Sequence, residues 1–412
     1  MKYLYLLFLS LILCNTCYGQ AESFDILLNR GESQFNKDLE KPDYNFAINN
    51  LKKAIELNPG NAEAHYFLGY AYSRFNSKDA SSVPNMRMPL VIKTSEEMER
   101  VISLTPLYKG KIISLDPYSK ITSEWGSLAF CYLANNKIDS AKWAFNEGKK
   151  RGGYDKFILA IAMATLNGCS KNSILVSSGD NYTYPLYYLQ LIEKVRPDVS
   201  VIDISLPNTI WYPKLVENTT SIKFAIKGPA LDMINYIPWS NSPDSILIYQ
   251  TNKFFLWTLK PSYQGRYLSR SDQILLSMLK KNQFKRDVYF TKGQVLNEQL
   301  SLENYLLVLP LIDKINAKNE QPQSVDQYIA DVQKTVFTLK PVNPYSQEEL
   351  TPIDCIRYDI YKKVLAFKEL KQYKTADRLI NLLKDYLPDK EFPCYSDELK
   401  VFYKYINNNQ FN

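Results

Sequence analysis

The sequence predicts two fold classes in one chain: helical hairpins at both ends and, between them, an α/β domain with a Rossmann-like, mostly parallel sheet. The first observation is a pair of helical patterns at residues 43–75, separated by an Asn-Pro-Gly-Asn turn. The second is a β-α-β pattern at residues 173–206, where two β-branched runs flank a short amphipathic stretch. The third is the helical spacing of apolar residues that resumes after residue 324.

The first 19 residues have the form of a secretory signal peptide. Lys2 precedes an apolar run at residues 3–13, and small or polar residues follow up to a preferred cleavage site between Gly19 and Gln20. The run is too short to span a bilayer, and no other stretch approaches the roughly 18 apolar residues that a spanning helix needs. We therefore expect an exported protein with no transmembrane segment in the mature chain.

The cysteines bear on anchoring and on redox state. A lipid anchor is less favoured, because the residues before Cys14 and Cys17 are poor predecessors of a lipidated cysteine. Four cysteines follow the signal peptide: Cys131, Cys169, Cys355 and Cys394. They are too few for a disulfide scaffold, and their spacing matches no zinc pattern. Because Cys355 and Cys394 bracket a predicted pair of helices, a bridge between them and two free thiols both remain open.

The remaining composition excludes several function classes. The chain has one histidine, His65, so histidine-dependent nucleophilic catalysis and histidine-rich zinc sites are not expected. No glycine-rich phosphate-binding motif follows a predicted strand, so we expect no nucleotide, no other cofactor and no metal. The formal charge of +7 is spread along the chain, and an exported protein rarely meets nucleic acid, so we expect no nucleic-acid partner.

Residues 20–170 are expected to form one helical domain. In residues 43–75, Ala47, Leu51 and Ala54 fall on one face of a first helix, and small residues recur on a second helix. Residues 124–152 repeat this pattern, whereas residues 76–117 break it with four prolines. The pattern resembles the tetratricopeptide repeat, whose helix pairs stack into a solenoid that binds protein partners. His65 would then line the core or the groove of the first repeat.

Residues 171–323 are expected to form the Rossmann-like α/β domain. A buried strand at residues 173–178 leads to a Gly-Asp-Asn turn, a helix that Pro185 opens, and a second strand at residues 199–206. Further strands are predicted at 221–226, 245–250, 288–291 and 305–312, and a further helix at 271–281. This alternation predicts a doubly wound sheet with helices on both faces.

In such a sheet, ligands bind beyond the carboxyl ends of the strands. The candidate ligand-binding residues there are Asp180, Asn181, Thr183, Tyr184, Asn208, Trp211, Tyr212, Thr291 and Lys292. Asp180 with Asp203 or Asp272 is the candidate pair for carboxylate catalysis on a sugar, which needs two acids about 5–10 Å apart. Turn formation and helix capping alone also explain Asp180 and Asn181.

Three segments resemble a known family. They read GDNYTYPLYYLQLIEKVRPDVSVIDISLPNTIWY, LSRSDQILLSMLKKNQFKRDVYFTKG and LENYLLVLP, within residues 172–313. They are similar to the soluble carboxyl-terminal half of an uncharacterised bacterial envelope family with a protein-O-mannosyltransferase-like membrane half. The resemblance implies the periplasm or cell envelope of a Gram-negative bacterium and a link to glycan transfer or glycoprotein handling. Tyr182 departs from the family pattern, which has a second aspartate at that place.

Residues 324–412 return to helical spacing, with Pro388 and Pro393 at the exit of the last predicted hairpin. The sequence as a whole favours a non-enzymatic scaffold that binds protein or glycoprotein partners through its repeat groove and its α/β domain. The alternative is a carbohydrate-active enzyme or glycan-binding module that uses Asp180. These two classes differ in whether Asp180 lies in an open cleft with a second carboxylate.

Overall fold

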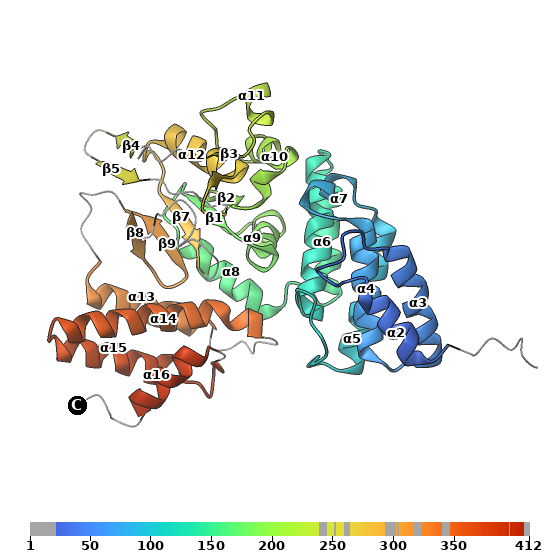
Figure 1. Ribbon diagram of the computed structural model, residues 1–412. Helices are drawn as coiled ribbons and strands as arrows, with labels where there is room; N and C mark the ends of the chain where they lie inside the picture. The colour runs from blue at the N-terminus through green and yellow to red at the C-terminus, as the bar shows by residue number, and fades with distance from the viewer. Residues whose placement is uncertain are drawn as a thin grey trace, which may run out of the picture. The chain divides into compact units, whose positions relative to one another are not determined.

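The computed structural model describes residues 22–238, 245–250, 253–258, 264–292, 302, 305–316, 323–339, 347–394 and 396–407. They form two compact units (Figure 1). Unit 1 takes its residues from 1–76 and 87–117, and unit 2 from 77–86 and 118–412. The signal peptide with its cleavage site lies outside the described residues, and the division expected at residues 170 and 323 stays a prediction.

The described residues of unit 1 form four helices. They are α2 (Phe24–Ser33), α3 (Tyr44–Leu57), α4 (Ala62–Asn76) and α5 (Met88–Leu104). Asp43 caps α3 by accepting a hydrogen bond of 3.0 Å from the backbone N–H of Phe46. Ala47, Leu51 and Ala54 are fully buried, which confirms the apolar face expected for the first repeat helix. A Cβ added at Gly69 would lie 2.5 Å from Cε of Met98, so the small residue lets α4 approach α5 closely.

The segment after α5, residues 105–116, crosses unit 1 without regular structure and is held by tyrosine hydroxyls. Tyr66 accepts a hydrogen bond from the backbone N–H of Ile113 at 3.0 Å and donates one to the carbonyl of Leu115 at 2.8 Å. Tyr70 accepts from the backbone N–H of Leu115 at 2.7 Å. Two buried tyrosines of α4 therefore satisfy main-chain groups of a segment that has no helix or strand of its own.

His65 is part of the core of unit 1. Its Nδ1 lies 2.6 Å from Oε2 of Glu97, and its Nε2 lies 3.0 Å from the carbonyl oxygen of Pro59. The side chain is largely buried. The single histidine thus joins α4 to α5 and to the turn before α4.

Unit 2 begins with further helices. They are the 3₁₀ turn η2 (Ala80–Asn85), α6 (Pro117–Ala134), α7 (Ile138–Lys150) and α8 (Lys156–Gly168). α6 and α7 contain the second hairpin that the sequence predicts. A Cβ added at Gly148 on α7 would lie 2.6 Å from Cβ of Trp125 on α6. The small residue therefore allows this second pair of helices to pack closely as well.

The central sheet of unit 2 is mixed. Its strands are β1 (Ile174–Ser177), β2 (Ser200–Asp203), β7 (Val288–Thr291), β8 (Leu306–Val308) and β9 (Ile312–Ile315). In the order β2-β1-β7-β9-β8, β1 pairs in parallel with β2 and β7, whereas β9 pairs antiparallel with β7 and β8. The prediction of a mostly parallel, Rossmann-like sheet was wrong. The single strand expected at 305–312 is instead β8, a turn at 309–311 and the first residue of β9, and that turn is too short for the crossover that parallel strands require.

The β-α-β unit itself is present. β1 and β2 are paired in parallel with Ser177 opposite Asp203, and the helix between them, α9 (Asp180–Leu191), packs on β2. The helix begins five residues before Pro185, so the expectation that Pro185 opens it was wrong. Gly179 adopts a φ of 85°, and its carbonyl accepts hydrogen bonds from the N–H groups of Tyr182 and Thr183. The first turn of α9 therefore forms directly after the glycine.

The segment 221–226 is not a strand, which corrects the prediction. Ile222 and Phe224 are buried, as the alternating pattern requires, but the main chain bonds to a helix. The backbone N–H of Ala225 donates to the carbonyl of Ser277 at 3.1 Å, and that of Ile226 donates to Oγ of Ser277 at 2.9 Å. The alternation of apolar residues correctly predicts which side chains are buried, but it does not predict which element the backbone bonds to.

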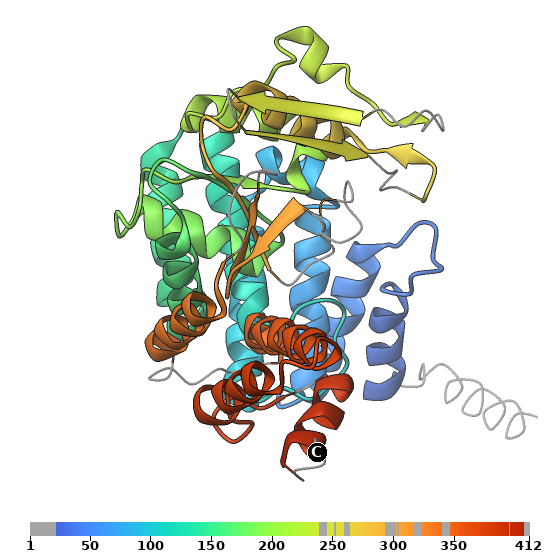
Figure 2. The same ribbon diagram turned by 90° about the vertical axis from the view of Figure 1, so that its left-hand side faces the viewer.

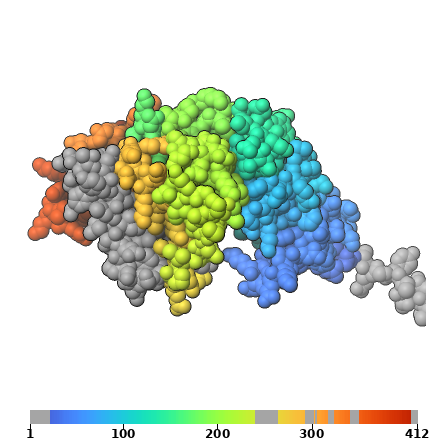
Figure 3. Space-filling view, turned by 90° about the horizontal axis from the view of Figure 1, so that it is seen from above, coloured from blue at the N-terminus to red at the C-terminus, as the bar shows by residue number. Residues whose placement is uncertain are grey.

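The elements around this segment complete one side of unit 2. They are η3 (Leu206–Asn208), α10 (Trp211–Thr219), α11 (Pro229–Asp232) and α12 (Arg270–Asn282). Figure 3 shows the yellow-green segment of α10 and α11 beside the orange segment of α12 on one face. The buried guanidinium of Arg270 joins them, because it donates to the carbonyls of Leu231 at 2.7 Å and Ile234 at 2.9 Å.

Two small antiparallel pairs lie outside the central sheet. β4 (Ser245–Gln250) pairs with β5 (Lys253–Thr258), and β3 (Ile237–Pro238) pairs with β6 (Tyr267–Leu268). The strand expected at 245–250 is therefore present, but it pairs with a neighbouring hairpin strand instead of the central sheet.

The carboxyl-terminal part is helical, as the sequence predicts. It comprises α13 (Val325–Leu339), α14 (Gln347–Glu369), α15 (Tyr373–Tyr386) and α16 (Asp397–Asn407), which lie together below the sheet in Figure 2. Its core also includes Phe157 from α8. Cys355 and Cys394 are both free thiols. Within the described part of the chain, no helix is both long and apolar enough to cross a membrane.

Candidate functional site

The first candidate site is the edge of the sheet at which β1 and β2 end, where the sequence places Asp180 and Asp203. Asp203 is 3% exposed. Its Oδ2 accepts a hydrogen bond of 2.6 Å from Oγ1 of Thr183, and its Oδ1 accepts from the N–H groups of Ser205 at 2.7 Å and Leu206 at 2.9 Å. Oδ1 therefore holds the turn that leads from β2 into η3, and Oδ2 joins the end of β2 to the first turn of α9.

Asp180 faces a helix that the sequence assigned to a different domain. Its carboxylate accepts a hydrogen bond from Oγ of Ser123 on α6. Beside it, Nδ2 of Asn181 donates to Oγ of Ser119 at 2.9 Å. The hydroxyls of Tyr184 and Ser127 are also 2.9 Å apart. One face of α6 thus contacts three of the candidate residues on α9.

Glycine makes this contact possible. A Cβ added at Gly126 on α6 would lie 2.2 Å from Cδ2 and Cγ of Tyr184. The Tyr184 ring also meets Phe130 edge-on, with 4.9 Å between ring centroids. The position that resembles a repeat glycine therefore receives an aromatic ring of the α/β part, and α6 fills the space beside the first turn of α9.

Burial controls the electrostatics of this edge. Desolvation by burial is the largest effect on Asp180, and it raises the pKa of this carboxyl group. The hydrogen bond from Ser123 and the positive charge of Lys120 lower the pKa. The negative charges of Asp203 and Glu124 raise it further. Desolvation likewise raises the pKa of Asp203, against the hydrogen bonds from Thr183, Leu206 and Ser205. The two acids influence each other, but each is bonded to groups of the protein itself.

The candidates after β2 also make internal contacts. The hydroxyl of Tyr212 accepts a hydrogen bond of 2.7 Å from the N–H of Asp203, and its ring is fully buried. Nε1 of Trp211 donates to the carbonyl of Ala80 at 3.0 Å. Oδ1 of Asn208 accepts from the N–H of Ser271 at 3.0 Å. These residues fasten η3 and α10 to η2 and α12.

Two other candidates have structural partners as well. Lys292, directly after β7, is buried and pairs with Asp313 at 2.9 Å and with Asp359 on α14. Burial disfavours its charge, but these two carboxylates outweigh the burial and raise the pKa of Lys292. Asp272 completes a capping box with Ser269 at the start of α12. The role of these residues in ligand binding stays a prediction.

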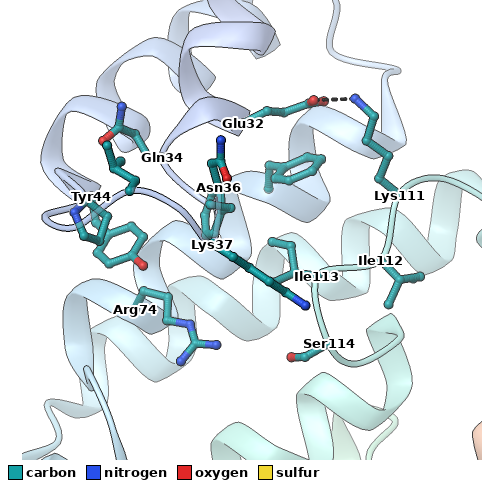
Figure 4. Close-up of a pocket in the computed structure, with 14 residues that line it drawn as sticks. Glu32, Gln34, Asn36, Lys37, Tyr44, Arg74, Lys111, Ile112, Ile113 and Ser114 are labelled. Atoms are coloured by element: carbon teal, nitrogen blue, oxygen red, sulfur yellow. Dashed lines mark hydrogen bonds and ion pairs between the residues drawn. The ribbon is translucent and has the colours of Figure 1, made fainter.

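The second candidate site is a pocket in unit 1 that the sequence did not predict (Figure 4). Its volume is about 690 Å³, within the usual range for ligand pockets. It lies between the α2–α3 connection, α4 and the 105–116 segment. The lining residues are Glu32, Gln34, Phe35, Asn36, Lys37, Leu39, Pro42, Tyr44, Phe67, Arg74, Lys111, Ile112, Ile113 and Ser114.

Aromatic rings form an apolar wall of this unit 1 pocket. The centroid of the Phe35 ring lies 5.6 Å from that of Tyr44 and 5.5 Å from that of Phe67. Leu39 and Ile112 add apolar side chains that are 40% and 49% exposed. The pocket therefore offers apolar surface that the folded unit leaves open to solvent.

The charges of the pocket are unequal. Nζ of Lys111 lies 2.5 Å from Oε2 of Glu32, so these two charges compensate each other. Lys37 and Arg74 have no acidic partner in the described part of the chain. In Figure 4 the side chains of Lys37, Arg74 and Ser114 end in the lower half of the pocket, below the Glu32–Lys111 pair. One part of the pocket is consequently cationic.

The sequence carried only a weak signal for this pocket. Its walls come from the turn before the first repeat and from the proline-containing segment after α5, and the repeat pattern describes neither. The unusual number of tyrosines, 31, was a usable sign, because Tyr66 and Tyr70 hold the 105–116 segment in place. Among the described residues, no group of three or more His, Cys, Asp or Glu side chains is arranged to bind a metal ion.

Comparisons with known families match two parts of the chain. Residues 36–74, which contain α3 and most of α4, match a family described as a TPR repeat. Residues 158–223, which run from α8 through β1, α9 and β2 to α10, match a family described as TMEM260-associated domain 2. No curated protein matches the sequence. The chain is therefore similar to tetratricopeptide-repeat proteins in unit 1, which confirms that resemblance and indicates a protein-binding scaffold.

Proposed function

We propose that the protein is an exported, non-catalytic scaffold that binds a segment of a protein or glycoprotein partner through the unit 1 pocket. The observation that carries this proposal is the open pocket of about 690 Å³ formed beside the helix pair that matches the TPR repeat. Repeats of this kind present concave surfaces to protein partners. The pocket combines exposed apolar groups with polar ones, as peptide-binding sites do.

The 105–116 segment supports a peptide as the bound form. Its backbone at Ile113 and Leu115 is bonded by the hydroxyls of Tyr66 and Tyr70. α4 therefore already binds a main-chain segment through side-chain hydroxyls. A partner segment entering the pocket would lie against Ile112, Ile113 and Ser114 of this internal segment.

Unit 2 has a supporting role in the proposal. Its strand-edge residues bond to α6, so this edge is used to hold a helical hairpin on the α/β part. The matched domain is named for an association with TMEM260, and the resemblance to an envelope family includes a mannosyltransferase-like membrane half. We therefore propose an envelope setting in which the partner is a glycoprotein.

The glycan-binding alternative depends on Asp180. A sugar-binding carboxylate must be open to the ligand, whereas the carboxylate of Asp180 accepts a hydrogen bond from Ser123 and is held under α6. A glycan array probed with the mature chain and with Asp180→Ala distinguishes the two functions. Binding that the substitution abolishes, while the variant stays folded, would favour the glycan module.

The proposed function is tested with a random peptide library displayed on phage and panned against the full mature chain. We expect selected peptides to slow amide hydrogen exchange in residues 34–44 and 111–114, where the pocket walls lie. Recovery of no binding peptides, or slowed exchange confined to other regions, would contradict the proposal. Export is tested separately by the mass of the chain recovered from the envelope fraction, which should begin at Gln20.

A further inference from the structure

The cationic part of the unit 1 pocket points to a more specific ligand. Arg74 lies in the last turn of α4, and Lys37 lies in the connection between α2 and α3. Both line the pocket, and neither has an acidic partner in the part of the chain that the structure describes. Two like charges in one pocket repel each other, and an anion between them would remove that repulsion.

A neighbouring ion pair shows which of the pocket's positive charges are compensated. Lys111 also lines the pocket, but Glu32 compensates its charge at 2.5 Å. The protein therefore neutralises one of its three pocket cations and leaves the other two uncompensated. Because Glu32 is the one acidic residue in the lining, an incoming carboxylate meets a net positive pocket.

The apolar wall of the pocket indicates that the ligand carries apolar groups next to its anionic group. Leu39 and Ile112, which line the same pocket as the ring cluster of Phe35, Tyr44 and Phe67, are exposed. A small inorganic anion would leave this apolar surface in water. An extended peptide with an acidic side chain next to apolar ones would cover it and would place its carboxylate at the cations.

We propose that the unit 1 pocket recognises an extended segment of a protein partner through an aspartate or glutamate side chain bound by Lys37 and Arg74, with flanking apolar side chains on the Phe35–Tyr44–Phe67 wall. This inference rests on the proposed function and names the class of its ligand. The guanidinium of Arg74 can bind a carboxylate with two hydrogen bonds, and Lys37 adds a point charge.

The test uses the peptides selected on the full mature chain. Each is synthesised with an amidated carboxyl terminus, labelled with fluorescein, and compared with an isosteric peptide in which Asp and Glu are replaced by Asn and Gln. Fluorescence anisotropy then measures the affinity of each peptide for the wild-type chain and for the double variant Lys37→Glu/Arg74→Glu. We expect the double variant to bind the acidic peptide at least about tenfold more weakly, the usual scale for loss of a charge-assisted hydrogen bond.

A matched control separates local from long-range charge effects. Lys52→Glu/Arg100→Glu changes the net charge of the same unit by the same amount, and both residues are exposed and lie outside the pocket lining. We expect this control variant to bind within about twofold of the wild type, because exposed charges beyond the pocket are screened by salt. Equal weakening by the two double variants would overturn the inference, since it would show only a general electrostatic attraction.

The remaining outcomes separate the inference from the function on which it rests. Equal binding of the acidic peptide and its isosteric amide would overturn the acidic ligand but leave peptide docking intact. Binding restricted to peptides with a free carboxyl terminus would also overturn it, because the carboxylate would then come from the chain end. Selection of no peptides by the wild-type chain would remove the proposed function as well. Circular dichroism confirms that both double variants are folded before binding is compared.

Discussion

Gly126 on α6 and Tyr184 on α9 are packed so closely that a Cβ on Gly126 would lie 2.2 Å from the tyrosine ring. We predict that Gly126→Ala lowers the free energy of unfolding by about 1–3 kcal/mol, the usual cost of overpacking. This outweighs the gain of about 0.5–1 kcal/mol that alanine brings in a helix interior. Urea denaturation followed by circular dichroism measures the change.

Gly60→Ala is the control for this substitution. The nearest atom to a Cβ at Gly60 is Oδ1 of Asn58 at 3.8 Å, which is an ordinary contact. We expect the free energy of unfolding to stay the same or to rise by less than about 1 kcal/mol. A stabilised Gly126→Ala variant would show that α6 does not pack on α9 in this way.

The second prediction concerns the pH dependence of Asp180→Asn. Because burial raises the pKa of Asp180, the folded state keeps its proton at pH values where the unfolded chain has lost it. The pKa of this carboxyl group is about 3.9 in the unfolded chain and higher in the folded protein. As the pH rises from the first value through the second, Asp180 therefore lowers the free energy of unfolding. Asparagine removes this loss and can still accept the hydrogen bond from Ser123, so the variant should gain stability relative to the wild type across that rise in pH.

Denaturation in urea at a series of pH values measures this difference. Asp139→Asn is the control, because the Asp139 side chain is 99% exposed and its substitution should have little effect at any of these pH values. If Asp180→Asn becomes progressively less stable than the wild type as the pH rises, the charged carboxylate is favoured in the fold, and the argument from burial is wrong.

The third prediction concerns the tyrosine that holds the 105–116 segment. Tyr66→Phe removes the hydroxyl that bonds the N–H of Ile113 and the carbonyl of Leu115. Leaving partly buried backbone groups without this partner costs about 1–3 kcal/mol, so the segment should open more often. We expect faster trypsin cleavage after Lys109 and Lys111 in the folded variant, measured by mass spectrometry.

Tyr72→Phe serves as the comparison for this experiment. Burial, with Glu97 and Glu96, raises the pKa of Tyr72 to about 12, but its hydroxyl has no hydrogen-bond partner among the described residues. Its removal should leave the cleavage rates after Lys109 and Lys111 unchanged. Equal acceleration in both variants would indicate a general loosening of unit 1 instead of release of the segment.

The fourth prediction concerns the thiols. Burial raises the pKa of Cys169 and of Cys355 to about 12, and it also raises the pKa of Cys131 and Cys394. Because alkylation requires the thiolate, iodoacetamide should label all four slowly at neutral pH while the protein is folded. In denaturant without reductant, the intact mass should show an adduct on each of the four. Two missing adducts that peptide mapping assigns to Cys355 and Cys394 would reveal a bridge between them.

Some of the fold follows from local pattern. The turn at residues 58–61, the caps of the repeat helices and the buried face of Ala47, Leu51 and Ala54 depend on near neighbours, so the sequence predicts the helix pair that α3 and α4 form. The pairing of β1 with β2 follows in the same way from one short crossover helix. The antiparallel β9 does not, because a strand pattern does not state the direction of its neighbour.

In the candidate site, too, the sequence predicts local features but not long-range contacts. The sequence identified Asp180, Asn181 and Tyr184 as residues after a strand, which is where they lie. It could not show that Ser123, Ser119 and Ser127, more than 50 residues earlier, bond to them, because those partners meet only when α6 packs on α9. A long-range contact of this kind leaves no periodic signal in either segment.

The sequence by itself determined the repeat helices, the β-α-β unit and the helical carboxyl-terminal part, because periodicity and turn chemistry act over a few residues. Only the tertiary structure decided that α6 covers the strand edge and that Lys37 and Arg74 line one pocket. Those two basic residues come from different elements, and their charges meet because α2, α4 and the 105–116 segment fold around the same space. Proximity of that kind is a property of packing, and packing is set by the whole unit.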